Sequence, residues 1–166
     1  MGMSLRRAGR IAIGLAAAFF IASCGGGTTG PNNSTYFVRF KANGSQVEFT
    51  NPVALAAGFG HSGTQYNMLV TGFDATSNAN IQVFDGSAIS AKTYSGYGVV
   101  GSAFVGSLIG YQPPGGPVYA SNATVTVTIT GLSATTVSGT FEGTVSATGH
   151  ANIQVTEGEF SVKRSN

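Results

Sequence analysis

Cysteine, tryptophan and charged residues are scarce in this chain of 166 residues. It contains one cysteine, Cys24, and no tryptophan, and 8% of its residues are charged, compared with about 25% in a typical globular domain. A single cysteine excludes an internal disulfide, so the fold must depend on its hydrophobic core, for which 42% of the residues are suited. The absence of tryptophan argues against a dedicated carbohydrate-binding module, which would use large aromatic rings.

The positive net charge of the chain comes from its first ten residues. The formal charge is +2, but Arg6, Arg7 and Arg10 supply three of the eight basic side chains. After residue 24, five basic and six acidic residues remain, which gives a net charge of −1. This balance lacks the basic surface that nucleic acids require, so we predict no nucleic-acid partner.

Residue types that carry catalysis or bind metals are also few. The two histidines, His61 and His150, are far apart in the sequence, whereas a zinc site needs three or four ligands, usually at short spacings. No Gly-x-Ser-x-Gly nucleophile motif occurs, and Asp74 and Asp85 flank predicted turns. We therefore predict no metal, no cofactor and no enzymatic activity, with a hydrolase left open only if two carboxylates meet in space.

One segment has the glycine spacing of a dinucleotide-binding loop, Gly96-Tyr97-Gly98-Val99-Val100-Gly101. That motif binds a dinucleotide only between a strand and a helix, with an acid about 20 residues further on. Here a Gly/Ser-rich segment and a proline-rich loop follow, and no acid occurs between Asp85 and Glu142. We therefore assign no dinucleotide cofactor to it.

The N-terminal segment has the features of an export signal. Three arginines precede an unbroken apolar run from Ile11 to Phe20, which is too short for the roughly 20 residues of a membrane-spanning helix. The run leads into Ile21-Ala22-Ser23-Cys24. These four residues match the lipobox at each position, so the sequence resembles a bacterial lipoprotein.

The resemblance implies that the signal, residues 1–23, is cleaved before Cys24 and that Cys24 carries the lipid. Residues 24–34 are rich in Gly, Thr and Asn, without charge or apolar periodicity, and predict a flexible tether. We predict that residues 35–166 form one domain. The protein is then anchored in the bacterial cell envelope through lipidated Cys24. We expect the outer membrane, at its periplasmic face or at the cell surface, and the absence of acids after Cys24 favours the periplasmic face.

The residues after the tether follow a strand pattern. From Tyr36 to Thr50 apolar and polar residues alternate on both sides of Asn43-Gly44, which predicts a hairpin with a type I′ turn. Tyr66–Phe73 and Asn80–Asp85 predict two further strands, and Lys92–Tyr94 a short one. The segment 95–116 is rich in Gly and Ser, and we expect it to be the least regular part of the domain.

The last forty residues predict a closing antiparallel meander. Val125, Val127 and Ile129 alternate with threonines, and a second strand runs through Phe141. Glu157-Gly158 predicts a turn between two shorter strands, making four in all. Gly139 and Gly143 occupy positions of the second strand where the alternation predicts apolar side chains. Glycines there indicate a facing aromatic ring or a bulge.

This tail, with Gly139-Thr140-Phe141 followed by Gly158-Glu159-Phe160, resembles that of a group of small uncharacterised lipoproteins from Bacteroidetes-type envelopes. The resemblance implies a signal, a lipid-bearing cysteine, a short tether and an opening Asn-Gly hairpin. It implies no activity.

The strand pattern as a whole predicts an all-β fold, an antiparallel β-sandwich of about eight to ten strands, with a closed β-barrel as the alternative. Four tyrosines, Tyr94, Tyr97, Tyr111 and Tyr119, are candidate ligand-binding residues because they crowd into the least regular segment; packing over the open end of the sandwich is their alternative role. We expect a non-enzymatic binding or structural module whose partner is an envelope protein or a glycan. The alternative is a barrel-like carrier of a small apolar or glycan ligand.

Overall fold

The computed structural model describes residues 35–121 and 125–165, which form one compact body of twelve strands and a single turn of 3-10 helix. The signal, Cys24 and the tether lie outside the described residues. The strands are β1 (Phe37–Ala42), β2 (Ser45–Phe49), β3 (Leu55–Ser62), β4 (Gln65–Phe73), β5 (Asn78–Asp85), β6 (Thr93–Ser95), β7 (Tyr97–Val100), β8 (Ala103–Gln112), β9 (Tyr119–Ala120), β10 (Val125–Leu132), β11 (Thr136–Val145) and β12 (Ile153–Ser165). The helical turn η1 (Pro52–Ala54) precedes β3.

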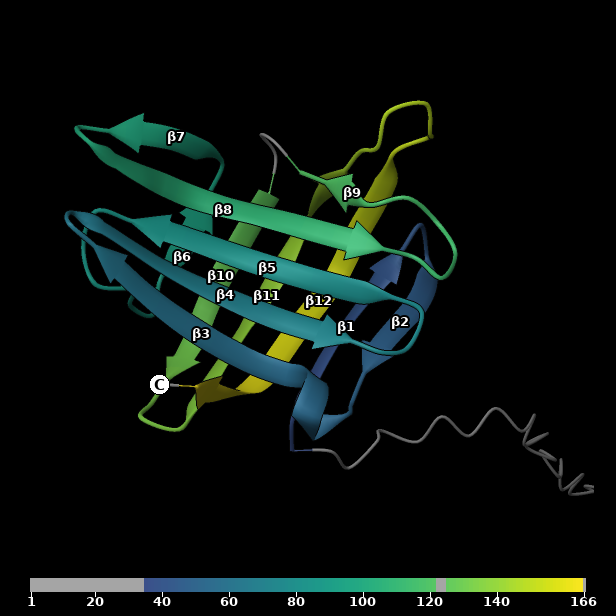
Figure 1. Ribbon diagram of the computed structural model, residues 1–166, viewed down its shortest axis with the longest axis horizontal. Coiled ribbons are helices and arrows are strands. Elements are labelled where there is room, and N and C mark those ends of the chain that lie inside the picture. The colour runs from purple at the N-terminus through teal and green to yellow at the C-terminus, as the bar shows by residue number, and fades with distance from the viewer. Residues whose placement is uncertain (1–34, 122–124, 166) are drawn as a thin grey trace, which may run out of the picture. The chain divides into compact units, whose positions relative to one another are not determined.

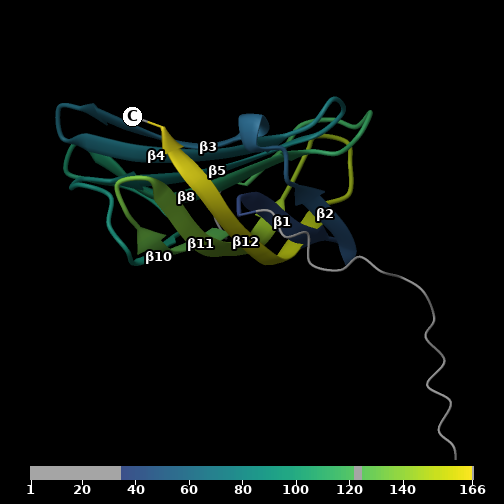
Figure 2. The same ribbon diagram turned by 90° about the horizontal axis from the view of Figure 1, so that it is seen from below.

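The strands form the predicted β-sandwich. One layer contains β6, β10, β11, β12, β1 and β2, and the other contains β3, β4, β5, β8, β7 and β9 (Figure 2). The strands of the two layers cross at a steep angle (Figure 1). The hydrogen-bonded path runs from β6 to β7 without closing, so the barrel alternative does not apply.

The structure has more strands than the eight to ten predicted, and the sheet is mixed. β12 is antiparallel to β11 and β1, but its last residues, Lys163–Ser165, run parallel to Ala56–Gly58 of β3. β12 therefore passes from one layer to the other and joins them at that corner. Alternation along each strand could not predict this parallel pairing, because it depends on where the far end of β12 arrives.

The closing meander is confirmed, but it consists of three strands rather than four. Glu157-Gly158 is not a turn: β12 continues through it as one strand of 13 residues. Glu157 has a φ of 52°, and the register against β1 and β11 shifts around it, so these residues form a bulge. Glu157-Gly158 was predicted to be a turn because glycine is common in turns, but glycine is common in bulges too, so the sequence does not distinguish the two.

The opening hairpin is also confirmed. β1 and β2 pair across Asn43 and Gly44, whose φ angles of 49° and 83° are both positive, as a type I′ turn requires. The side chain of Asn43 accepts a hydrogen bond from the backbone N–H of Gln154 at 2.8 Å. The turn thereby fixes the hairpin against the start of β12.

The segment 95–116 is more regular than predicted. It contains β7 and the ten-residue strand β8, which lies between β5 and β7. Glycines at 96, 101 and 106 have positive φ angles and supply the turns and a kink between these strands. Abundant glycine was therefore a sign of sharply turned strands rather than of a loop. The predicted loop is confined to the prolines after β8.

One hydrophobic core fills the space between the layers, and two buried serines complete it at the edge opposite β12. The Oγ of Ser107 on β8 lies 3.0 Å from the carbonyl oxygens of both Tyr94 and Val125, in the other layer. The Oγ of Ser121 accepts a hydrogen bond from the backbone N–H of Ile109 at 2.7 Å. These hydroxyls form hydrogen bonds with backbone groups that the pairing between strands does not satisfy.

Candidate functional site

A groove at one end of the sandwich is the best-formed candidate for a binding site. It lies between β2, the turn from β4 to β5 and the loop after β8, which meet at the same end of the sandwich in Figure 1. Its volume is about 450 Å³, within the range of small-molecule sites. Phe49, Ile153 and Val47 contribute apolar side chains, and Pro113 and Pro114 contribute a rigid wall.

Asp74 stands at the edge of this groove, in a turn built around its carboxylate. Oδ1 accepts hydrogen bonds from the backbone N–H groups of Thr76 and Ser77 at 2.7 and 2.8 Å, and from the Thr76 hydroxyl. Oδ2 accepts one from the Ser77 hydroxyl at 2.9 Å. The bonds from the backbone of Thr76 and from Ser77 lower the pKa of Asp74 to about 2. The carboxylate therefore stays ionised at neutral pH.

Tyr111 on β8 also lines the groove. Its side chain is 4% exposed, and its ring packs edge-on against Phe40 with 5.1 Å between centroids. The hydroxyl forms no hydrogen bond with any of the described residues. Burial and the negative charge of Asp74 raise the pKa of Tyr111. Tyr111 and Asp74 both line the groove.

The charge of the groove is negative. Its lining includes the carboxylates of Glu48 and Asp74 and no basic side chain. The ion pairs found among the described residues use other acids, namely Glu159, Glu157 and Asp85. The groove therefore combines apolar side chains, a tyrosine hydroxyl and two carboxylates that form no ion pair in the described part of the chain.

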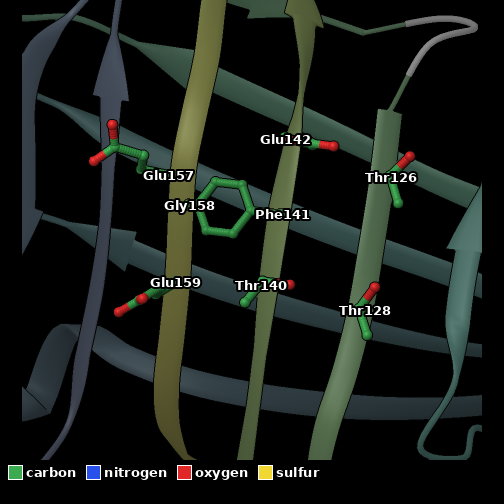
Figure 3. Close-up of a pocket in the computed structure, with 8 residues that line it drawn as sticks. All are labelled: Thr126, Thr128, Thr140, Phe141, Glu142, Glu157, Gly158 and Glu159. Atoms are coloured by element: carbon green, nitrogen blue, oxygen red, sulfur yellow. The ribbon is translucent and has the colours of Figure 1, made fainter.

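A second hollow lies on the outer face of the meander (Figure 3). Glu142, Glu157 and Glu159 line it together with threonines of β10 and β11. In Figure 3 the side chain of Glu142 extends toward β10, whereas those of Glu157 and Glu159 extend away from it, toward β1. The structure thus brings three carboxylates to one face but turns them apart.

Two of these carboxylates are held by cross-strand ion pairs. Arg39 donates to Glu159 Oε2 through Nε at 3.0 Å and through a second guanidinium nitrogen, and Lys41 Nζ lies 2.7 Å from Glu157 Oε1. All four side chains are at least one third exposed. The acids of β12 therefore serve to join it to β1, and the arrangement does not present a catalytic pair.

Asp85 forms a third ion pair, next to the predicted turn. Its Oδ2 lies 2.5 Å from Nζ of Lys92, and this contact ties the segment between β5 and β6 to the end of β5. Burial is the largest single effect on the pKa of Asp85 and raises it, but the hydrogen bonds from Lys92 and Ser87 and the charge of Lys92 together outweigh it, and the net shift is downward. The same hydrogen bond raises the pKa of Lys92.

The four tyrosines considered as ligand-binding residues do not share one loop surface. Tyr94, Tyr111 and Tyr119 belong to the hydrophobic core, on β6, β8 and β9. Tyr97 on β7 is 42% exposed. Of the four, Tyr111 lines the end groove. The others stand elsewhere: the Tyr94 hydroxyl is hydrogen-bonded to the backbone of Ser90.

Tyr97 belongs to an exposed patch on the edge strand β7, which we call the β7 patch. Its ring stacks on that of Phe104 at 5.6 Å and meets that of Phe84 at 5.7 Å. Val99 and Val100 beside it are 63% and 66% exposed. The Gly-x-Gly-x-x-Gly segment is this same edge strand with its two flanking turns, and β8 rather than a helix follows it.

The histidines stand apart from each other and from the groove lining. His61 is in β3, not in a loop, and stacks on Tyr66 at 4.1 Å, while His150 follows the end of β11 in a turn. Among residues 35–121 and 125–165, no group of three or more His, Cys, Asp and Glu side chains could hold a metal ion. No helix within the described ranges is long and apolar enough to cross a membrane.

Sequence reasoning missed most of the groove. Phe49 and Ile153 belong to the core, and alternation does not show that they also line a groove; Asp74 was predicted only to flank a turn. The signal that could have identified Asp74 is Asp-Ala-Thr-Ser, in which an aspartate followed by hydroxyl residues caps its own turn. Nothing in the sequence places that turn beside β2, because the contact depends on how the layers stack.

Comparisons of the chain with protein-family models, with curated proteins and with solved structures found no match.

Proposed function

We propose that this protein is a lipid-anchored component of the bacterial cell envelope, whose β-sandwich acts as a non-enzymatic binding module. The observation that carries the proposal is the position of the one cysteine, Cys24, directly after a basic segment, an apolar run and Ile21-Ala22-Ser23. In this arrangement the sulfur receives a lipid and the signal is removed. The membrane is then the first partner of the protein.

The surface chemistry of the domain supports binding as its role. The polar side chains that alternate with the core residues of β10 are threonines rather than charges, as in many exported β proteins. The acids of β12 are taken up in ion pairs with β1. What the domain offers to a partner is the end groove and the β7 patch, and an envelope protein or a glycan remains the expected partner.

The anchor is tested by metabolic labelling of the full chain with an alkyne-bearing fatty acid in an expressing bacterium. We expect label on the wild-type protein, recovery in the outer-membrane fraction, and no label on the Cys24→Ser variant. Ser23→Ala is the matched control, because alanine is also small, and it should be labelled like the wild type. A wild-type protein that carries no label would refute the anchor.

A further inference from the structure

The end groove contains a hydroxyl that the fold itself does not use. The side chain of Tyr111 is 4% exposed and lines the groove, and its hydroxyl forms no hydrogen bond with any of the described residues. A phenylalanine at this position would fill the same space in the core, so the hydroxyl is available to a ligand that enters the groove.

The carboxylate of Asp74 also has capacity left. Each oxygen of a carboxylate offers about two acceptor sites. Oδ1 accepts three hydrogen bonds and has no site left, whereas Oδ2 accepts one, from Ser77. Oδ2 can therefore accept a further hydrogen bond from a donor that enters the groove. Glu48 also lines the groove and adds a second negative charge there.

We propose that the end groove binds a small organic ammonium ion, with its charged group against Asp74 and Tyr111 and its apolar body on Phe49, Ile153 and the two prolines. This inference rests on the proposal that the domain is a binding module and names the ligand class. Two carboxylates with no base in the lining repel anions, and the volume of about 450 Å³ suits a molecule rather than a protein segment. The ammonium donates to Asp74 Oδ2 and to the Tyr111 oxygen.

The test uses three probes of similar shape and different charge, 2-phenylethylamine, 2-phenylethanol and 3-phenylpropanoate. Binding to the full chain, processed by the expressing bacterium and held in uncharged detergent micelles, is measured at pH 7 by ligand-observed NMR. The ammonium probe should bind at least fivefold more tightly than the alcohol, and the carboxylate more weakly than both. Equal binding of the three probes, or no binding of the ammonium, would overturn the proposal.

Variants locate the site and correct for partition of the probes into micelles. Tyr111→Phe should weaken binding of the ammonium about three- to tenfold while unfolding no earlier than the wild type on heating. Asp74→Asn should remove the preference for the ammonium over the alcohol. Glu48→Gln reduces that preference without touching the turn, which covers the case in which Asp74→Asn unfolds.

Glu142→Gln, in the hollow of Figure 3, is the control, and it should bind all probes like the wild type. If it weakens ammonium binding as much as Asp74→Asn does, the probe senses general negative charge and the groove is not the site. Failure of these tests leaves the lipid on Cys24 untouched, so the groove and the anchor can be rejected independently.

Discussion

Phe160 on β12 lies directly opposite Gly139 on β11, and its ring occupies the space that a side chain at residue 139 would need. Two residues away the relationship is reversed, because Phe141 on β11 lies opposite Gly158 on β12. The two Gly-x-Phe segments of the tail therefore form one antiparallel pair, in which each glycine accommodates the ring of the other strand. This explains why both segments carry the same three-residue pattern.

The pairing predicts that neither glycine can be replaced. A Cβ at Gly139 would lie 2.3 Å from the carbonyl oxygen of Thr128 and 2.6 Å from the Phe160 ring. We expect Gly139→Ala to lower the free energy of unfolding by at least about 2 kcal/mol, because overpacking a core costs 1–3 kcal/mol and backbone must also move. Urea unfolding of the purified variant measures this.

Gly98→Ala is the matched control for that experiment. Gly98 is also in a strand and has a negative φ, but a Cβ there would meet nothing within 4 Å. Its unfolding free energy should stay within about 0.5 kcal/mol of the wild type or rise. If Gly139→Ala is as stable as Gly98→Ala, the ring does not fill the glycine site as described.

The fold class, the opening hairpin and the closing meander could all be predicted from the sequence, because they depend on alternation and turn residues near each other in the chain. The space above Gly139 could also be predicted. A glycine at a strand position where the alternation calls for an apolar side chain indicates that a facing ring or a bulge occupies that space. The parallel pairing of β12 with β3 was not, because it joins segments about a hundred residues apart. β8 was missed because its glycines hide its alternation.

Buried serines are predicted to hold the second edge of the sandwich together. Ser107→Ala removes the hydroxyl that bridges β8 to the carbonyl groups of Tyr94 and Val125. Ser121→Ala leaves the backbone N–H of Ile109 without its acceptor. Each should lower the free energy of unfolding by about 1–3 kcal/mol, the cost of an unpaired buried group. Thermal unfolding measures the loss.

Ser87→Ala serves as control for the serines, since its hydroxyl is exposed and forms a 3.3 Å bond to Asp85. It should change stability by less than about 0.5 kcal/mol. A loss at Ser107 no larger than at Ser87 would show that its hydroxyl does not join the layers. The same result at Ser121 would show that its bond to Ile109 does not stabilise the fold.

Asp74 predicts how stability depends on acid pH. Its pKa is about 2 in the folded protein, below the value of about 3.9 of an unfolded chain. A lowered folded pKa stabilises the fold above the unfolded value, and this contribution is lost as the pH falls from about 4 through 2. The free-energy difference between wild type and Asp74→Asn should therefore shrink over that window, measured by urea unfolding at pH 5, 4, 3 and 2.

Ser77→Ala separates the effect of the Ser77 hydroxyl on the pKa of Asp74 from the effect of the backbone hydrogen bonds. It removes the hydroxyl bond to Oδ2 but keeps both backbone bonds to Oδ1. The variant should retain most of the acid-dependent loss of stability seen in the wild type. A pH-independent difference between wild type and Asp74→Asn would mean that the turn does not lower the pKa of Asp74.

The β7 patch predicts a solubility effect without a stability effect. Val100 is 66% exposed at the end of a strand whose outer edge has no partner among the described strands. An exposed strand edge can pair with a strand of another molecule, and a lysine side chain on that edge opposes the pairing. Val100→Lys should raise the concentration at which the protein associates, seen by light scattering, and leave the unfolding temperature unchanged. Val118→Lys, equally exposed but in a loop, should not alter association.

The central claim is that Cys24 becomes the first residue of a lipid-bearing protein. Its most direct test is the mass of the N-terminal peptide of the protein purified from membranes of an expressing bacterium. We predict a peptide that begins at Cys24 and carries the added mass of a diacylglyceryl group. A peptide with a free thiol at Cys24, or one that still contains residues 1–23, would contradict the account.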